Sequence, residues 1–528
     1  MRDGRRSDWL MPSIADMLFL SLFFKILNSG SELLNDGDTG WHIVTGENIL
    51  RTFKIPSTDP YSHTAAGTPW TTHEWLSEVI FGLSHRLMGL NGVVLVSAAV
   101  ITLTFFFLYL FMLRRGVNTL VAISFTILAA IASSLHWLAR PHIFSFPLVL
   151  AFVVILELYQ REKKDYLKLL PPLMILWVNL HGGYVLGLIL VSVYVVGNLL
   201  IALANPAKNV EARKSVRTLG VIAVLTLLAA LVNPHGPAIL YFPFHNIGRA
   251  YLIDTVAEWL SPDFHKHKLF EFTLLLFVTI FVLSRKTVDV FDGIIALILT
   301  HLSLYSMRFI PLFSIVVTPM VAARAGDLLE STVQRPGSLK GMKVIGDILR
   351  AISENVTTLE MRFTSHVWIY GTLIICLMIG LNGGRVRKAQ VMEYGHTKTE
   401  FPVDALDFAL ANHITGNVFN NDGWGGYIIY HAYPTYRVFM DGRSDMYGVS
   451  MVEEYVKVAS ASLGYEDVLD KYSVTWVIYN NNTALSQLLL ASGTWKLVYA
   501  DSIANVFLKD IPENHDLIER YGNTSFVF

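Results

Sequence analysis

Apolar runs close to 20 residues long recur along most of this 528-residue chain. An α-helix needs about 20 mostly apolar residues to cross the hydrocarbon core of a bilayer, so the runs predict a polytopic membrane protein. Charged residues make up 16% of the chain, against about 25% in ordinary soluble proteins. The formal net charge of −1 provides no basic excess, and we expect no nucleic-acid partner.

We expect about eleven spanning helices, with the short basic loops on the cytoplasmic side. The first apolar segment is read as an uncleaved helix with the N-terminus inside, because no small-residue cleavage site follows it. The C-terminal region then lies outside. Arg385, Arg387 and Lys388 at its start are the exception to the rule that basic loops lie on the cytoplasmic side. The predicted spans cover 12–29, 92–113, 117–138, 142–160, 167–180, 184–204, 218–233, 269–284, 289–304, 309–323 and 366–382.

This topology divides the chain into two domains. Residues 1–384 form the predicted transmembrane domain, with a first outer loop at 31–91, a second outer loop at 234–268 and a cytoplasmic loop at 324–365. Within the first loop, "EWLSEVIFGLSHRLM" is too polar to span and predicts an amphipathic helix over 74–88 in the membrane interface. Residues 385–528 alternate short β-rich runs with helical patterns, which predicts a C-terminal extracytoplasmic α/β domain.

Polar side chains gather at the outer ends of the predicted spans, whereas the inner loops carry mostly lysine and arginine. Ionisable residues at membrane depth are costly and usually face a cavity or a partner. The asymmetry therefore predicts a functional site on the outer face. Its candidate residues are Asp36, Asp38, His42 and Glu74 in the first outer loop, Arg140 and His142 after the third span, His181 after the fifth, His235 after the seventh and Arg308 after the ninth.

Arginine and histidine beside acids suit two chemical tasks. Cations hold a phosphate or pyrophosphate group, and a carboxylate acts as a general base or binds a divalent metal. Together they predict a transferase that takes a lipid-phosphate-linked donor at the outer leaflet. A base would deprotonate an acceptor hydroxyl, and the cations would stabilise the departing lipid phosphate.

Each candidate also has a purely structural interpretation. The string "NDGD" is turn composition, and Asp38 could instead cap a helix that opens at Thr39. Arg140 and Arg308 could extend to the phosphates of surrounding lipids. Glu74 could cap the interfacial helix, and the histidines beside proline or glycine could satisfy loop carbonyl groups.

The C-terminal region carries two glycine-rich strings, "NNDGWGGYIIY" and "FMDGRSDMYG". Neither matches a phosphate-binding loop or a dinucleotide fingerprint. Asp441, Arg443 and Asp445 in the second string form either a turn or a loop that contacts the acceptor.

The order of these features resembles the GT-C fold of membrane glycosyltransferases. Protein O-mannosyltransferases, aminoarabinose transferases and the catalytic subunits of oligosaccharyltransferases share it. The strings "DTGWHIVTGENIL" and "WGGYIIYHAYPTYRVFMDGRSDMYG" also look like those of uncharacterised bacterial members. The resemblance implies a sugar donor on a polyprenyl phosphate or pyrophosphate, and a bacterial inner membrane. It implies no nucleotide cofactor, because another enzyme would charge the lipid on the inner side.

The resemblance also implies roles for particular residues. The catalytic acid of the family lies in the first outer loop, so Asp36 or Asp38 would be the base or a ligand of a divalent metal such as Mg or Mn. Many members have two adjacent acids there, whereas Gly37 separates them here. The string "MRFIP" looks like an arginine-aromatic-proline motif of the family, which makes Arg308 a phosphate contact.

The sequence thus predicts an inverting hexosyl- or pentosyltransferase of the GT-C type. Its partners would be a polyprenyl-phosphate-linked sugar, membrane lipids and an acceptor whose class stays open. The alternatives are a lipid-linked-sugar transporter or flippase, and a non-catalytic membrane scaffold with an outer interaction domain. A transporter tends to show internal repeats and polar residues at mid-bilayer, and a scaffold needs no acids and arginines at one face.

Overall fold

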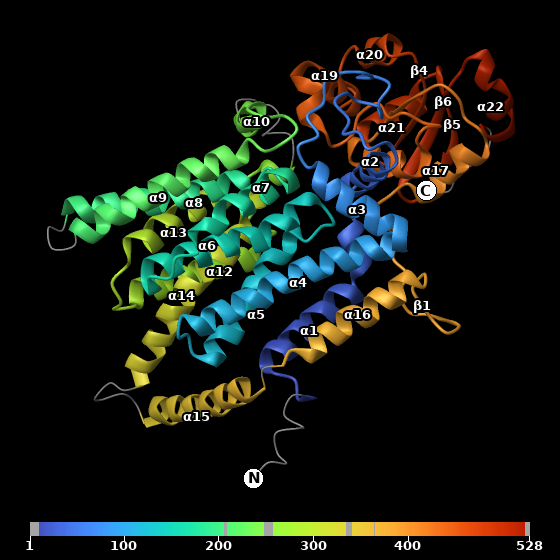
Figure 1. Cartoon of the computed structure of the whole chain (residues 1–528). Helices are drawn as coiled ribbons and strands as arrows, with labels where there is room; N and C mark the ends of the chain where they lie inside the picture. Colours follow the sequence, from blue (N-terminus) through green and yellow to red (C-terminus); the bar gives the residue numbers. More distant parts are fainter. Residues whose placement is uncertain (1–9, 205–208, 248–256, 334–339, 364, 523–528) are drawn as a thin grey trace.

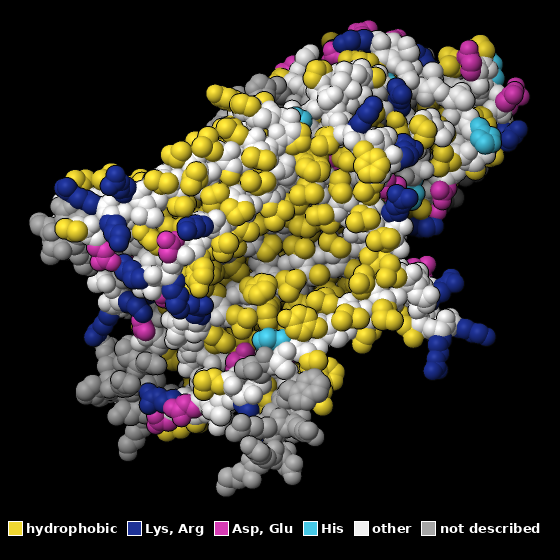
Figure 2. Space-filling view, in the orientation of Figure 1, with side chains coloured by type: hydrophobic (Ala, Val, Ile, Leu, Met, Phe, Trp, Pro, Cys, Tyr) yellow, Lys and Arg dark blue, Asp and Glu magenta, His cyan; other side chains and the backbone are white. Residues whose placement is uncertain are grey.

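The computed structural model describes residues 10–204, 209–247, 257–333, 340–363 and 365–522. Long helices form a bundle, and an α/β region lies over one end of it (Figure 1). A broad belt of hydrophobic side chains covers the side of the bundle, while charged side chains gather toward its ends (Figure 2). This distribution is the one expected of a helical bundle that faces lipid along its sides.

A helix lies in each of the eleven ranges predicted to span the membrane. Their bounds are α1 Ile14–Asn28, α4 Leu90–Arg114, α5 Thr119–Ser133, α6 Ser145–Glu162, α7 Leu170–Leu180, α8 Tyr184–Ala204, α9 Asn209–Ala230, α12 Lys268–Leu283, α13 Val290–Tyr305, α14 Ile310–Val333 and α16 Val367–Leu381.

By length and composition, five helical stretches among the described residues can each cross a bilayer alone. The chain is therefore an integral membrane protein, and its full number of spans stays a prediction. The five stretches are Leu90–Arg114, Thr119–His136, Pro141–Glu162, Tyr184–Ala204 and Met307–Leu329.

Side-chain caps fix where several of these helices begin. The Ser13 hydroxyl accepts the backbone N–H of Asp16, and the Asp16 carboxylate accepts the N–H of Ser13, both at 3.0 Å. This reciprocal pair satisfies two of the N–H groups that a helix start leaves unpaired. Asn118 and Asp289 cap α5 and α13 with their own side chains.

The stretch predicted as the cytoplasmic loop 324–365 is largely helical. The end of α14 occupies its first part, and α15 runs over Lys340–Arg362. The axis of α15 turns by 66° into α16. Glu360 of α15 accepts the N–H groups of Ile14 and Ala15 at 2.7 and 3.2 Å, so an anion from α15 stabilises the start of α1.

The C-terminal region is built on a four-stranded sheet in the order β3-β4-β6-β5, in which β3 pairs parallel to β4 and the other pairs are antiparallel. A two-stranded hairpin, β1 Arg385–Val386 and β2 Ala389–Gln390, precedes it. The sheet strands are β3 Asn417–Asn420, β4 Val474–Asn480, β5 Trp495–Ala500 and β6 Ala504–Lys509. The helices of the region are α17 Val403–Ala411, α18 Gly425–Ala432, α19 Ser444–Ala459, α20 Tyr465–Lys471, α21 Ala484–Ala491 and α22 His515–Tyr521.

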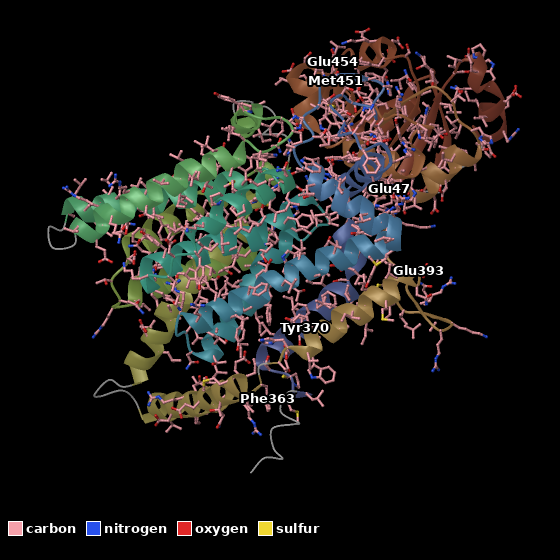
Figure 3. All side chains as sticks on the ribbon, in the orientation of Figure 1. Glu47, Phe363, Tyr370, Glu393, Met451 and Glu454 are labelled. Atoms are coloured by element: carbon pink, nitrogen blue, oxygen red, sulfur yellow. The ribbon has the colours of Figure 1, made fainter. Side chains whose placement is uncertain are left out.

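The first outer loop contains two helices, α2 Asp38–Thr52 and the helix α3 Trp75–Met88 that the sequence predicts. Trp41, Tyr61 and Trp70 of this loop are buried in the hydrophobic core of the C-terminal region. Figure 1 shows α2 beneath the helices of that region, and Glu47 of α2 lies at the junction (Figure 3). The loop therefore joins the two predicted domains.

Glycines bring α2 and α18 together backbone to backbone. A Cβ at Gly40 would overlap the carbonyl oxygen of Gly426, and a Cβ at Gly37 would overlap that of Gly423. The glycine-rich string "NNDGWGG" thus serves close helix packing, which is one of the uses of glycine where two backbones approach.

Candidate functional site

The two acids of the first outer loop lie at the start of α2. Asp38 is the first residue of α2 and Gly37 is its N-cap, so Asp38 does not cap a helix that opens at Thr39. The Asp36 carboxylate accepts the backbone N–H of Asp38 at 2.8 Å. The Asp38 carboxylate accepts the indole N–H of Trp41 at 3.1 Å. Both acids point to one cation, since the two terminal nitrogens of Arg140 lie 2.9 Å from Asp36 Oδ2 and 2.9 Å from Asp38 Oδ2.

A third carboxylate, which the sequence interpretation missed, joins this group. Glu258 lies in a short 3₁₀ helix, Ala257–Trp259, of the second outer loop. Its Oε1 is 2.8 Å from Arg140, and its Oε2 accepts two hydrogen bonds from Arg308 at 2.9 and 2.7 Å. The Arg308 guanidinium also stacks on Trp259 at 4.6 Å. The two arginines predicted to hold phosphate are thereby brought together through one carboxylate.

A second group of ionisable side chains surrounds Glu74. Its carboxylate lies 3.5 Å from His73, 3.6 Å from His181 and 3.9 Å from His42. His42 is 99% buried and its other ring nitrogen lies 3.5 Å from Glu78. Histidine is thus concentrated around one acid, at the same end of the bundle as the arginines.

The remaining histidine candidates take less central positions. His142 donates its Nε2–H to the carbonyl of His136 at 2.9 Å, and its ring lies beside that of His181. His181 pairs with the Ser145 hydroxyl at 2.8 Å. His235 contacts the backbone of Thr72 at the rim of the group. The loop-carbonyl interpretation therefore fits His142 and His235 better than it fits His181.

Burial and charge shift the proton affinities of these groups. Burial raises the pKa of Asp38 to about 7, although Arg140 opposes the shift. Burial also lowers the pKa of His42 to about 3 and that of His181 to about 4, so both rings are neutral at physiological pH. An acid with a pKa near neutrality is suited to accept a proton during a reaction.

His73 and Glu74 form the charged pair of the second group. Burial disfavours the charge on both, yet the attraction of Glu74 raises the pKa of His73 to about 9. His73, followed by His181, holds the pKa of Glu74 well below its usual range. His73 is therefore a partly buried cation in this group, and the sequence signal for it was only its place beside Glu74.

The C-terminal region also reaches the candidate site. The backbone at Gly442 packs directly on the Asp38 carboxylate, where any side chain would overlap it. The negative charge of Asp445 contributes to the raised pKa of His73. The "DGRSD" string thus provides one wall of the site as well as a turn.

Arg443 of the same string is fully buried and structural. Its guanidinium pairs with Asp59 at 2.8 Å and with Asp441 at 2.6 Å, and it stacks on Trp70 at 4.6 Å. Asp59 and Trp70 come from the first outer loop, so this ion pair fastens the loop to the C-terminal region.

Comparison with known proteins supports the fold and leaves the site unassigned. No protein-family model matches the sequence, and no curated protein sequence matches it.

Two solved structures match over nearly the whole chain, both at 13% identity and a TM-score of 0.50. One is the archaeal oligosaccharyltransferase AglB from Archaeoglobus fulgidus, in complex with an inhibitory peptide and a dolichol-phosphate, with 94% of this chain and 75% of that chain covered. The other is ArnT from Cupriavidus metallidurans bound to undecaprenyl phosphate, with 96% and 99% covered. The chain therefore has a GT-C-like fold, as the sequence predicts.

Proposed function

We propose that this integral membrane protein with a GT-C-like fold is a glycosyltransferase. It would move a sugar from a polyprenyl-phosphate-linked donor to an acceptor on the extracytoplasmic side. The observation that carries the proposal is the convergence of Asp36, Asp38, Arg140 and Arg308 from three distant segments at one end of the bundle. The two solved structures compared above contain a dolichol-phosphate and an undecaprenyl phosphate, which agrees with a lipid-phosphate donor here.

In this mechanism Asp38 is the general base. Its carboxylate accepts the proton of an acceptor hydroxyl as the acceptor oxygen attacks the anomeric carbon of the donor sugar. The bond between the anomeric carbon and the phosphate oxygen breaks, and the lipid phosphate leaves with the electron pair. Attack from the face opposite the leaving group inverts the anomeric configuration. Arg140 and Arg308 stabilise the charge that develops on the phosphate.

Asp36 and the Glu74 group have positioning roles in the proposal. Asp36 fixes the start of α2 and one edge of Arg140. The His181 Nδ1 atom accepts the N–H of Gly183 at 3.0 Å, so this neutral ring presents its other nitrogen to Glu74. The neutral His42 ring is buried beside the same carboxylate, and in the proposal both rings orient Glu74. The ring of His142 lies beside that of His181, and His235 contacts the backbone of Thr72.

A divalent metal held by Asp36 and Asp38 is the alternative role for the acid pair. The described geometry places the Arg140 guanidinium between the two carboxylates. In the described part of the chain, no group of three or more His, Cys, Asp or Glu side chains is arranged to hold a metal ion. A metal such as Mg or Mn at this position would therefore have to displace Arg140, and we derive no step through it.

The proposed orientation follows from the basic loops. The site end of the bundle and the C-terminal α/β region lie outside, and the N-terminus lies inside, of a bacterial inner membrane. The acceptor and the sugar stay open.

The test is transfer from a panel of polyprenyl-phosphate sugars by the purified protein, with and without EDTA. We expect the wild type to release lipid phosphate. Asp38→Asn should lose about 10²- to 10⁴-fold in rate, as expected for removal of a general base, while an exposed control, Asp516→Asn, should match the wild type. Loss of activity with EDTA would assign the acids to a metal instead. Binding of a donor without turnover would favour a transporter, and no binding at all would favour a scaffold.

A further inference from the structure

Glu258 bridges the two arginines in the way that a phosphate group would. One of its oxygens faces Arg140 at 2.8 Å and the other receives both hydrogen bonds of Arg308, at 2.7 and 2.9 Å. The planar guanidinium group of arginine binds a carboxylate and a phosphate with the same geometry, through two parallel N–H···O hydrogen bonds. The side chain is only partly exposed, at 24%.

Glu258 is a true anion in this position. Burial opposes its ionisation, but Arg140 and then Arg308 hold its pKa well below the usual range. Its carboxylate is therefore charged at neutral pH.

Charge balance favours the exchange of Glu258 for a phosphate over the presence of both. With all three carboxylates ionised, the group holds two arginines against Asp36, Asp38 and Glu258, an excess of one negative charge. A lipid phosphodiester adds one more negative charge if it enters beside Glu258. If it replaces the Glu258 carboxylate on the two arginines, the charge of the group is unchanged.

We propose that the Glu258 carboxylate occupies the phosphate subsite of the donor and leaves it when the lipid phosphate binds. This inference rests on the proposed function, because it takes Arg140 and Arg308 as the phosphate contacts.

Backbone contacts hold the segment around Glu258 in place, so the exchange involves only the Glu258 side chain. The Ser306 hydroxyl donates to the carbonyl of Glu258 at 3.0 Å, and the Met307 N–H donates to the carbonyl of Leu260 at 3.1 Å. The segment that carries Glu258 is thus fixed to the start of the Arg308 turn. The proposed exchange therefore takes place by rotation of the Glu258 side chain away from both arginines.

The exchange has a consequence for turnover. After transfer, the lipid carries a phosphate monoester with a charge of about −1.5 to −2, which is more than the single charge of the departed Glu258. The returning Glu258 carboxylate competes with this product for the arginines. Glu258 therefore weakens the hold on the product as well as on the donor.

Binding of undecaprenyl phosphate to the purified full-length protein tests the inference. Glu258→Gln removes the competing charge and keeps the size of the side chain, so binding should tighten by about tenfold, because a charge-assisted pair no longer has to be broken. Glu271→Gln, an exposed glutamate at the start of α12, is the matched control and should leave the affinity unchanged. Undecaprenol, which lacks the phosphate, should bind the wild type and Glu258→Gln equally.

The outcomes separate this inference from the proposed function. Equal or weaker binding of undecaprenyl phosphate by a folded Glu258→Gln protein would overturn the role of Glu258 and leave the transferase proposal standing. Glu258→Asp, which keeps the charge on a shorter side chain, should bind no more tightly than the wild type, and tightening there would also overturn it. If neither the wild type nor Glu258→Gln prefers undecaprenyl phosphate to undecaprenol, both the subsite and the donor class are wrong.

Discussion

Replacement of Gly40 by alanine probes how the bundle and the C-terminal region hold the base. A Cβ on Gly40 would lie 2.8 Å from the carbonyl carbon of Gly426 and 2.9 Å from Cβ of Tyr430, and it would overlap the carbonyl oxygen of Gly426. Carbon atoms normally approach no closer than about 3.5 Å. The rigid backbones of α2 and α18 must therefore separate by about 0.7 Å or more.

We expect this separation to cost about 1–3 kcal/mol of stability, as overpacking does in well-packed cores. Because Asp38 lies half a turn before Gly40 on α2, it moves with the helix. A displacement approaching 1 Å of a catalytic group costs up to about 10²-fold in rate. Gly40→Ala should therefore lower both the thermal unfolding midpoint in detergent and the rate of lipid phosphate release.

Gly371→Ala is the control. Gly371 lies inside α16 with no atom within 4 Å of its added Cβ, so alanine should be neutral or slightly stabilising there. If Gly40→Ala unfolds at the same temperature as Gly371→Ala, α2 and α18 are not packed as described.

Three further predictions concern charge. If Asp38 is the base, kcat/KM should fall about tenfold per pH unit below its pKa of about 7, and a profile that stays flat from pH 8 to pH 5.5 would speak against Asp38. Arg443→Met leaves the buried Asp59 without its ion-pair partner and should lower the free energy of unfolding by about 3–5 kcal/mol. The loss is measured as a lower thermal unfolding midpoint or a lower yield of monodisperse protein. An unchanged midpoint would show that the ion pair does not fasten the first outer loop to the C-terminal region. The folded-state pKa of His73 is about 9, above the ordinary 6.5, so the stabilisation from its pair with Glu74 is complete below pH 6.5 and is lost as pH rises through 9. The midpoint of His73→Gln should lack this fall, and an identical pH profile in both proteins would contradict the pairing.

The prediction of the membrane helices rests on local physics. Desolvated backbone groups must bond within their own segment in a bilayer, so long apolar runs such as 92–113 can only be helical, and α4 is found there. The prediction of a helix over 74–88 also rested on the local pattern of residues, and α3 occupies that range. The stretch 324–365 shows the limit, because the mixed polarity of α15 did not distinguish a loop from a helix.

The candidate site was predictable where the bilayer itself gives a reason. Placing the charges of Arg140 and Arg308 at membrane depth costs free energy, and that cost alone indicated that both belong to a common site. Glu258 lies in a polar loop where an acid has no such cost, and nothing near it in the sequence shows that it faces Arg140, 118 residues earlier. Gly442 was missed for the same reason, and Asp445 was predicted only as part of a turn or of a loop that contacts the acceptor.

The sequence by itself determined that this chain is helical, lies in the membrane and concentrates acids, arginines and histidines at one face, because these properties follow from hydropathy and from the cost of burying charge. Only the tertiary structure decided which of these groups meet. The burial that raises the pKa of Asp38, the glycine contacts that place α2 under α18, and the carboxylate that joins Arg140 to Arg308 all depend on contacts between distant segments. Such contacts are set by the packing of the whole chain, which a local pattern of residues does not contain.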